Sequence, residues 1–466
     1  MSEYDIAVLG GGPGGGAAAA RADAKGASVC LIEQAELGGV CLNSGCMPTK
    51  AMLAASGIYH RALHAEHMGI SFTGGRVDTK AFMKRVLEVV AELREAAEKG
   101  HVSRRNVTII RGTGRLTGPN SLAVERGGTT HEVRAKSIVI ATGARAIRPD
   151  FLPWDSGKLW TTEEATRAED LPESVVVMGG GVIGTEFACV YGELGIETHV
   201  LEMTDQLIPG MDSDAAKAVE ELLTARGVDV RTGSKVKSMT ADDDGVTAEL
   251  ENGESVRGAK ALIAVGRRAN IENIGLEEAG VRVADGIIPV DAKCRTNVEN
   301  IYAVGDVAEK QQFAHLAERM GNIAGENATG GDMSDDRSVM PIGQYTHPEV
   351  AVVGLSEQQA REKYDKVAIA RYSYSNSGTG KVYDETEGQV KIAINPDDGR
   401  IYGAAVIGPH ATDYAHELVL AMKHGITLEG ILDTIHMHPT FAEGIVAAAE
   451  GWEMRRIRKE ARKARK

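Results

Sequence analysis

Short apolar runs and glycine turns dominate the first part of the chain. Residues 5–9 form an apolar run, a glycine-rich turn follows, and an alanine-rich stretch at 16–24 leads to a second apolar run at 27–32. This order predicts a strand, a turn, a helix and a strand, the unit from which parallel sheets are built. Residues 72–99 are amphipathic and highly charged, and we expect a helix there that forms an exposed excursion from the first domain.

The same unit recurs in the second quarter of the chain. Apolar runs at residues 174–178 and 197–201 flank a glycine turn and a helical stretch at 185–194. Two further hydrophobic strands are expected at 136–142 and 300–304, and each is followed by glycine. Because ligands bind where strands end in open α/β sheets, these glycines are candidate cofactor contacts.

The pattern changes at about residue 345. Alternating strands such as 390–394 and 402–407 are followed by helices, which is typical of a separate α+β domain. We therefore predict an α/β chain with two Rossmann-like dinucleotide-binding domains and a C-terminal α+β domain.

Composition narrows the class of protein. The chain has 466 residues, enough for about three domains, and its 43% apolar and 25% charged content is typical of globular proteins. A net charge of −14 argues against nucleic-acid binding by the body of the protein. No signal-like or membrane-spanning run is found, so we expect a cytoplasmic protein, with the lumen of an organelle after processing as the alternative. Five cysteines in so long a chain are no secreted disulfide framework, and Cys30, Cys189 and Cys294 are expected to be buried.

The first glycine turn carries a dinucleotide-binding fingerprint. Gly10, Gly12 and Gly15 have the G-x-G-x-x-G spacing between a strand and a helix, and Glu33 ends the next strand. The glycines allow a pyrophosphate to reach the helix N-terminus, and the acid can accept a hydrogen bond from ribose hydroxyls.

The second turn repeats this fingerprint with Gly179, Gly181 and Gly184, and its acid is Glu202. The two copies share one spacing from first glycine to acid (33 − 10 = 23 and 202 − 179 = 23). Glu202 would repel a 2′-phosphate, and the next residues, 203–205, contain no arginine, which favours NAD over NADP.

Cys41 and Cys46 follow the first fingerprint. In a regular helix their Cα atoms would be roughly 8.6 Å apart, whereas a disulfide needs about 4.4–6.8 Å. The helix must therefore be distorted between them, which Asn43 and Gly45 suit. A disulfide in so small a loop is easily reduced, as a redox centre requires. The alternatives are two buried thiols or half of a metal site, but no further Cys or His ligands follow and no metal is expected.

These motifs, together with Gly305-Asp306 and the run His-Pro-Thr-Phe-Ala-Glu at 438–443, resemble the flavin-dependent pyridine nucleotide–disulfide oxidoreductases. Within that family the chain is most similar to the dihydrolipoamide dehydrogenase group. Supporting runs are Gly-Gly-Val-Cys-Leu-Asn at 38–43, Ile-Pro-Gly-Met-Asp at 208–212, Ala-His-Leu-Ala-Glu at 314–318 and Pro-Glu-Val-Ala-Val-Val-Gly at 348–354.

The resemblance implies FAD at the first fingerprint, NAD at the second, and a head-to-tail homodimer. Each active site would combine Cys41 and Cys46 of one subunit with His438 and Glu443 of the other. Cys46 matches the cysteine that lies against the flavin, and Cys41 the one that exchanges with substrate. The remaining expected site residues are an ion pair beside the flavin, Lys50 and Glu186, and the cofactor contacts Gly10, Gly12, Gly15, Glu33, Lys50, Thr142, Gly143, Gly179, Gly181, Gly184, Glu202, Gly266, Asp306 and Ala314.

The resemblance also suggests domain limits and a partner. We expect an FAD-binding domain at 1–148, an NAD-binding domain at 149–269, a central region at 270–344 that completes the FAD site, and a dimerisation domain at 345–466. The partner would be a dihydrolipoyl group on a carrier protein, in a possible multienzyme complex, or a small dithiol.

Elementary chemistry supports these roles. A thiol with a pKa near 8.5 is only about 3% ionised at pH 7, so attack of a dithiol on the disulfide needs a base. His438 is the natural base, and Glu443 would orient its ring and stabilise the imidazolium. His436 is a competing candidate, but the spacing to Glu443 favours His438.

Three departures from the family pattern concern the substrate. Gln312-Phe313 is closer to mercuric reductases, residues 376–381 lack the usual arginine, and residues 408–416 are unusual. A metal-ion reductase is therefore one alternative, although no cysteine pair near the C-terminus would deliver a soft metal. Reduction of another disulfide with NAD(P)H is a second, and a docking subunit with a vestigial redox centre is a third.

The C-terminus is strongly basic, with eight Lys and Arg residues between 455 and 466. Such a run is usually a solvated helix face. The functional hypothesis is an electrostatic dock for an acidic lipoyl-carrying protein.

Overall fold

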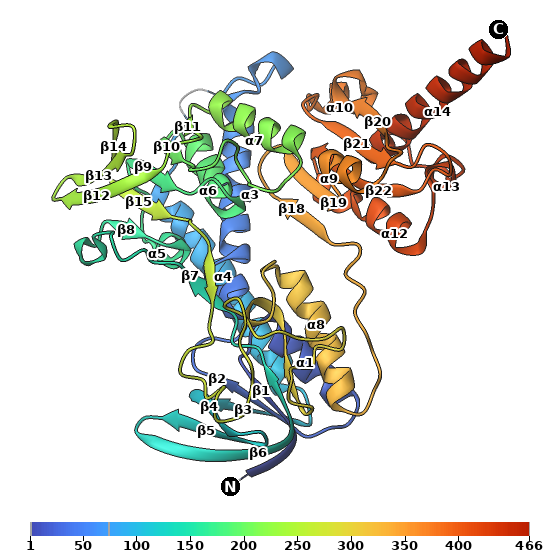
Figure 1. The fold of residues 1–466 in the computed structure, drawn as a ribbon. Coiled ribbons are helices and arrows are strands. Elements are labelled where there is room, and N and C mark those ends of the chain that lie inside the picture. The colour runs from blue at the N-terminus through green and yellow to red at the C-terminus, as the bar shows by residue number, and fades with distance from the viewer. Residues whose placement is uncertain (1, 73–74, 466) are drawn as a thin grey trace.

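The computed structural model describes residues 2–72 and 75–465, in three units that each have their own sheet (Figure 1). The first sheet has the order β3-β2-β1-β6-β5-β4, with β17 also paired with β6. Its strands are β1 (Ser2–Leu9), β2 (Val29–Glu33), β3 (Val107–Arg111), β4 (Thr113–Gly118), β5 (Ser121–Arg126), β6 (Thr129–Ile140) and β17 (Ile301–Ala303).

The centre of this sheet is parallel and buried on both faces. β1 pairs in parallel with β2 and β6, and the whole of β2 is buried, as expected for a continuous apolar strand between two layers. Helix α1 (Pro13–Ala24) follows β1, and α8 (Ala314–Ala328) packs on it. A Cβ at Gly321 of α8 would lie 2.1 Å from the carbonyl oxygen of Gly14, so only glycine allows this close helix contact.

The second unit has a parallel five-stranded sheet in the order β11-β10-β9-β15-β8 and an antiparallel meander β12-β13-β14. A short pair, β7 with β16, joins the chain segments that connect the first two units. The elements are β7 (Ala144–Ala146), β8 (Leu159–Trp160), α5 (Thr162–Arg167), β9 (Ser174–Met178), α6 (Val182–Glu193), β10 (Glu197–Leu201), α7 (Ser213–Ala225), β11 (Asp229–Arg231), β12 (Val236–Asp242), β13 (Gly245–Leu250), β14 (Ser255–Gly258), β15 (Lys260–Ile263) and β16 (Arg267–Ala269).

The third unit has an antiparallel sheet in the order β18-β19-β22-β21-β20. Helix α14 (Glu443–Ala464) packs Ile445, Ala448 and Trp452 into its core and then extends away from the sheet (Figure 1). The other elements are β18 (Pro341–Gln344), β19 (Glu349–Gly354), α9 (Glu357–Lys363), β20 (Ala368–Ser373), α10 (Gly378–Tyr383), β21 (Gln389–Ile394), β22 (Ile401–Gly408), α11 (Ala411–Tyr414), α12 (His416–His424) and α13 (Leu428–Leu432).

The predicted fold class is confirmed, but two expectations about helices were wrong in detail. Helices α1 and α6 begin three residues earlier than predicted, because the last glycine of each fingerprint already lies in the first helical turn. The helix predicted over 72–99 is α4 (Thr79–Val102), which Asp78 caps by accepting a hydrogen bond from the Ala81 N–H. Residues 73 and 74 of that prediction lie outside the described residues.

Helix α4 is also more than an exposed excursion. Met83 and Val86 on its inner face are fully buried, and with Met52 of α3 (Cys46–Leu63) they share a core with Phe187 of α6. The helix pair after the first fingerprint therefore packs into the second unit, which places the cysteine segment between the two dinucleotide-binding units. No helix in the described part of the chain is long and apolar enough to cross a membrane.

Candidate active site

The first glycine turn is held tight by its backbone and by Glu33. Gly10 has φ +110°, and a Cβ there would lie 2.3 Å from the carbonyl oxygen of Ala141; a Cβ at Gly15 would lie 1.9 Å from that of Gly10. The Glu33 carboxylate, at the end of β2, accepts a hydrogen bond from the Gly11 N–H at 2.7 Å. Gly12 precedes α1 without a side-chain cap, so the helix N–H groups are available to a phosphate.

The second turn has the same geometry. Gly179 has φ +108°, and a Cβ at Gly184 would lie 1.9 Å from the carbonyl oxygen of Gly179. Glu202 accepts hydrogen bonds from the N–H groups of Gly180 at 2.7 Å and Thr204 at 2.8 Å. A side chain at Gly181 would meet nothing within 4 Å, so the space beside the turn is open for a ligand. Both turns thus fit a dinucleotide.

The expected cofactor contacts around the first site lie next to strand ends, at a helix start and in turns. The Thr142 hydroxyl donates to the carbonyl oxygen of Asn270 at 2.8 Å, and Gly143, with φ +69°, would point a Cβ into open space. Gly266 has φ +114°, and its carbonyl oxygen accepts a hydrogen bond from the N–H of Ile147, at the junction of the first two units. Ala314 begins α8, whose first N–H groups have no side-chain cap.

Asp306 follows β17 and is half-buried. Burial raises the pKa of its carboxyl, and the nearby Arg267 guanidinium opposes that rise. Burial lowers the pKa of Arg267 itself. The negative charges of Asp306 and Cys46 act in the opposite direction and raise this pKa. Sequence reasoning missed Arg267, because nothing in the local sequence indicates that it lies near Asp306 and Cys46.

The two cysteines lie at a break between helices. Helix α2 (Gly39–Asn43) carries Cys41, and α3 begins at Cys46. The distortion predicted between them is present, but it falls at Ser44 and Gly45 rather than at Asn43. Asn43 instead holds the turn, since its amide donates to the carbonyl oxygens of Leu37 and Gly39 at 2.9 Å each.

Both cysteines are free thiols in this structure, and they are hydrogen-bonded to each other. The bond from Cys41 and the charge of Lys50 lower the pKa of Cys46 to about 7 against the opposing effect of burial. The same hydrogen bond, burial and the neighbouring Cys46 charge raise the pKa of Cys41. The pair is therefore polarised: Cys46 is the sulfur that ionises first, and Cys41 keeps its proton.

Lys50 and Glu186 are brought together from two units of the fold. Nζ of Lys50, one turn after Cys46 on α3, lies 2.7 and 2.9 Å from the carboxylate oxygens of Glu186 on α6. The ammonium group also lies 4.4 Å from the centre of the Tyr345 ring, and the Tyr345 N–H donates to Glu186 at 3.1 Å. Sequence reasoning did not identify Tyr345, because it lies just after β18, 159 positions from Glu186.

His438 and Glu443 also form a pair. Nδ1 of His438 lies 2.8 Å from Oε1 of Glu443, and the Thr440 N–H donates to the other oxygen at 2.8 Å. Burial opposes ionisation of Glu443, but these two hydrogen bonds outweigh it and hold the pKa of the carboxyl below its usual value. His436, the competing candidate, is bound to Glu417 at 2.9 Å instead.

Two of the sequence departures meet beside this pair. A surface hollow of about 450 Å³ lies next to the His438 loop. It is lined by Thr379, from the departure at 376–381, by Tyr383 just beyond it, and by His410 and Tyr414, from the departure at 408–416. Pro439 and Thr440 also line this hollow. Gln312-Phe313 lies elsewhere, at the start of α8, where Phe313 stacks on His315 with 5.4 Å between ring centres.

Comparison with known proteins agrees with this geometry. Residues 4–321 match the model of the family described as pyridine nucleotide-disulphide oxidoreductase, and residues 340–449 match its dimerisation domain, which supports a homodimer. A dihydrolipoyl dehydrogenase of Bacillus subtilis is 37% identical over 465 residues, covering 96% of this chain and 98% of the relative. Similar enzymes of Geobacillus stearothermophilus (36% identical, covering 96% of both chains) and Haloferax volcanii (35%, covering 96% and 95%) also match.

Solved structures point to the same fold. LpdA of Mycobacterium tuberculosis has a TM-score of 0.89 at 27% identity, covering 97% of this chain and 100% of LpdA. A Cu(II) complex of the HOCl-induced flavoprotein disulfide reductase RclA of Escherichia coli has a TM-score of 0.88 at 25% identity, covering 97% and 99%. The chain therefore belongs to the pyridine nucleotide-disulphide oxidoreductase family and is an enzyme of the dihydrolipoyl dehydrogenase-like, flavoprotein branch of that family.

Proposed function

We propose that this enzyme oxidises dihydrolipoyl dithiols with NAD, using the Cys41–Cys46 pair and bound FAD. The observation that carries the proposal is the polarised thiol pair at the start of α3, with the pKa of Cys46 lowered to about 7 and that of Cys41 raised. A pair of this kind has one sulfur suited to hold charge inside the protein and one suited to exchange with a substrate.

The first half-reaction exchanges disulfides. Nε2 of His438 takes the proton of a substrate thiol, and the substrate thiolate attacks Sγ of Cys41 in the oxidised pair, which breaks the Cys41–Cys46 bond and leaves Cys46 as a thiolate. The second substrate thiol then releases its proton to solvent and attacks the substrate sulfur that is bound to Cys41, and the departing Cys41 sulfur takes the proton that His438 holds. The products are the substrate disulfide and the reduced cysteine pair, which has gained the two electrons.

FAD, when bound, would accept these electrons and pass them to the nicotinamide as a hydride. The residues that fit its site are the first glycine turn, Glu33, Asp306 and the start of α8. Lys50, held in place by Glu186, would stabilise negative charge near Cys46. The second glycine turn, backed by Glu202, would hold the NAD.

A second candidate is reduction of a metal ion or of another disulfide with NAD(P)H. The structural likeness to RclA, solved as a Cu(II) complex, favours it, as do the departures that line the hollow beside the His438 loop. A catalytically inactive docking subunit is the third possibility.

The experiment is turnover by the purified FAD-loaded protein at pH 7–8. NAD reduction by dihydrolipoamide that is abolished in Cys46→Ser supports the leading proposal and excludes the docking subunit. Faster oxidation of NAD(P)H by Cu²⁺ or by another disulfide than NAD reduction by dihydrolipoamide would instead select the second candidate.

A further inference from the structure

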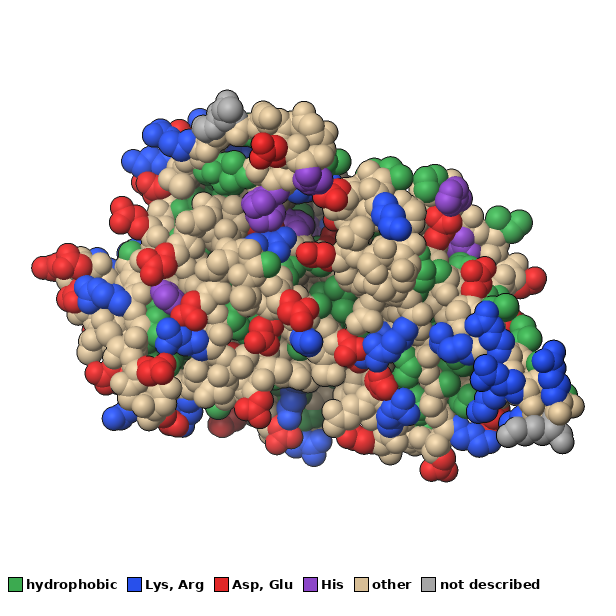
Figure 2. Space-filling view, turned by 90° about the horizontal axis from the view of Figure 1, so that it is seen from above, with side chains coloured by type: hydrophobic (Ala, Val, Ile, Leu, Met, Phe, Trp, Pro, Cys, Tyr) green, Lys and Arg blue, Asp and Glu red, His purple; other side chains and the backbone are tan. Residues whose placement is uncertain are grey.

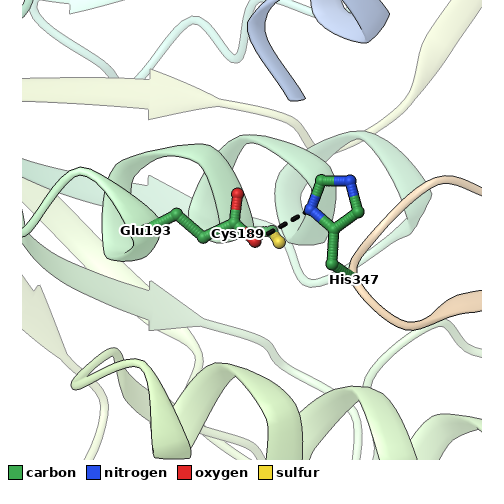
Figure 3. A group of neighbouring side chains, drawn as sticks. All are labelled: Cys189, Glu193 and His347. Carbon is green, nitrogen blue, oxygen red and sulfur yellow. Dashed lines mark hydrogen bonds and ion pairs between the residues drawn. The ribbon is translucent and has the colours of Figure 1, made fainter. Parts of the chain in front are cut away.

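A second group of reactive side chains lies away from the cysteine pair of the active site. Cys189 and Glu193 are one turn apart on α6, and His347 comes from the connection between β18 and β19. Their possible ligand atoms, Sγ, a carboxylate oxygen and a ring nitrogen, all lie within 4.8 Å of one another. Figure 3 shows the His347 ring turned toward the Glu193 carboxylate, with the Cys189 sulfur beside it.

The positions of the three residues suit metal coordination. Residues four apart on a helix project from the same face, so Cys189 and Glu193 present their ligands together, and His347 approaches from a different element. Nδ1 of His347 lies 2.8 Å from Oε1 of Glu193. Ligand atoms around a tetrahedral zinc ion, at about 2.0–2.3 Å from it, are roughly 3.3–3.8 Å apart. The separation of His347 from Glu193 is shorter than that value, and no two of the three ligand atoms are more than 4.8 Å apart.

Neighbouring groups hold the ligands in place. The Ser56 hydroxyl donates to Oε2 of Glu193 at 2.6 Å, and Nε of Arg226 lies 3.3 Å from Oε1. Arg226 also donates to the carbonyl oxygen of His347. A Cβ at Gly57 would lie 2.6 Å from the His347 ring, so glycine at this position of α3 makes room for the ring. Such outer contacts are what orient metal ligands in proteins.

Burial and charge complete the argument. The side chains of Cys189 and Glu193 are fully buried, whereas 39% of the His347 side chain is exposed, so the group can be reached from the His347 side. A thiolate at Cys189 and the Glu193 carboxylate together carry a charge of −2, which the Arg226 guanidinium beside Glu193 offsets in part, so the site keeps a net negative charge that attracts a divalent ion. A Cys, His and carboxylate set is borderline in softness and matches Zn²⁺.

We propose that Cys189, Glu193 and His347 bind a zinc ion, with water from the exposed side of His347 as the fourth ligand. Binding releases the Cys189 thiol proton to solvent, and neutral His347 coordinates through Nδ1 while it keeps its proton on Nε2. The site joins α6 to the connection between β18 and β19 of the third unit, and it is separate from the Cys41–Cys46 pair.

The test uses the FAD-loaded full-length protein with Cys41→Ser and Cys46→Ser, so that the active-site thiols cannot bind the metal. Zinc sulfate is added, unbound metal is removed by dialysis against a weak chelator, and bound zinc is measured by mass spectrometry. We expect about one zinc per chain, with one sulfur neighbour at roughly 2.3 Å in X-ray absorption spectra.

Substitutions identify the ligands. Cys189→Ala in this background should lower zinc affinity at least tenfold and remove the sulfur signal, and His347→Gln should lower affinity by a similar factor. Cys30→Ala is the matched control, since Cys30 is an equally buried thiol in β2 and should change neither result. Cys189→Ala changes a fully buried residue and could prevent FAD binding or dimer formation. His347→Gln changes a partly exposed residue, so it tests the site even in that case. Less than about 0.2 zinc per chain in the background protein, or binding unaffected by His347→Gln, would overturn the proposal.

Discussion

Nδ1 of His438 is bound to Oε1 of Glu443 at 2.8 Å, while 78% of the His438 side chain remains exposed to solvent. The other ring nitrogen, Nε2, is therefore free to act on a substrate. Among the described residues, neither member of the pair hydrogen-bonds to α2 or α3, which carry the cysteines. We propose that the base acting at Cys41 is His438 of the partner subunit, in the head-to-tail dimer that the family resemblance implies.

Hybrid dimers test this arrangement. Cys46→Ser and His438→Ala homodimers should each be nearly inactive, but dissociating and reassociating an equal mixture should restore activity. About half of the dimers would then be hybrids with one intact site of two, so recovery should approach a quarter of the wild-type rate. Full inactivity of a mixture whose hybrids are verified by native mass spectrometry would place each site within one chain.

Substitution of the base should lower the chemical rate. His438→Ala should reduce kcat for dihydrolipoamide oxidation by about 10²–10⁴-fold, because the substrate thiol would no longer be deprotonated. Glu443→Gln should reduce it by about 10- to 10²-fold, since the ring would lose its orienting carboxylate. His424→Ala, on an exposed histidine at the end of α12, is the matched control. Equal rates for His438→Ala and this control would remove His438 from the mechanism.

The reactivity of Cys46 should follow its lowered pKa. In the reduced protein, alkylation of Cys46 by iodoacetamide should be slow below pH 7, rise as the pH passes about 7, and level off above it, because only the thiolate reacts. Lys50→Met should move the midpoint upward by about one pH unit, since the ammonium charge helps to lower the pKa. Peptide mass spectrometry measures both curves, and identical midpoints would contradict the assigned role of Lys50.

Glu202 should set the choice of nicotinamide cofactor. Its carboxylate is buried at the end of β10, and the next residues, 203–205, offer no arginine to a 2′-phosphate. We expect kcat/KM for NAD to exceed that for NADP by roughly 100-fold, and Glu202→Gln to narrow the ratio by about tenfold through loss of charge repulsion. Glu33→Gln is the control, because Glu33 backs the first turn in the same way. A ratio shifted equally by both variants would mean that the effect is structural.

The basic end of α14 offers a test of docking. Arg455, Arg458, Lys459, Arg462 and Lys463 lie together where this helix extends from the third unit, and Figure 2 shows them as blue side chains at one end of the molecule. Trp452 is buried in the core of that unit, so a truncation at residue 451 would damage the fold. Neutralising substitutions beyond Trp452 are therefore the better test.

Changing Arg458, Lys459, Arg462 and Lys463 to Gln should raise KM for an acidic lipoyl-carrying protein severalfold and weaken its salt dependence. KM for free dihydrolipoamide should not change. The control removes four exposed charges elsewhere, Lys84, Arg85, Lys217 and Lys235. An unchanged KM and salt dependence would show that the tail is only a solvated helix end.

Local features could be read from the sequence because their causes are local. Each fingerprint is one continuous strand, turn and helix, and the strands at 174–178 and 197–201 have the bounds that the hydrophobic pattern predicted. The break between Cys41 and Cys46 follows from helix geometry, and the spacing of His438 and Glu443 places both in one short turn before α14.

Tertiary structure decided the features that join distant segments. Lys50 meets Glu186 across 136 positions, and Tyr345 and Arg267 reach the cysteine segment from other units. Helix α4 could be recognised as amphipathic, but its inner face could be assigned to the second unit only once α3 and α6 were in place. Cys189 was predicted to be a buried packing residue, and no local spacing places His347 beside Cys189 and Glu193. Periodicity reports which face of an element is buried, whereas the partner of that face depends on how the whole chain packs.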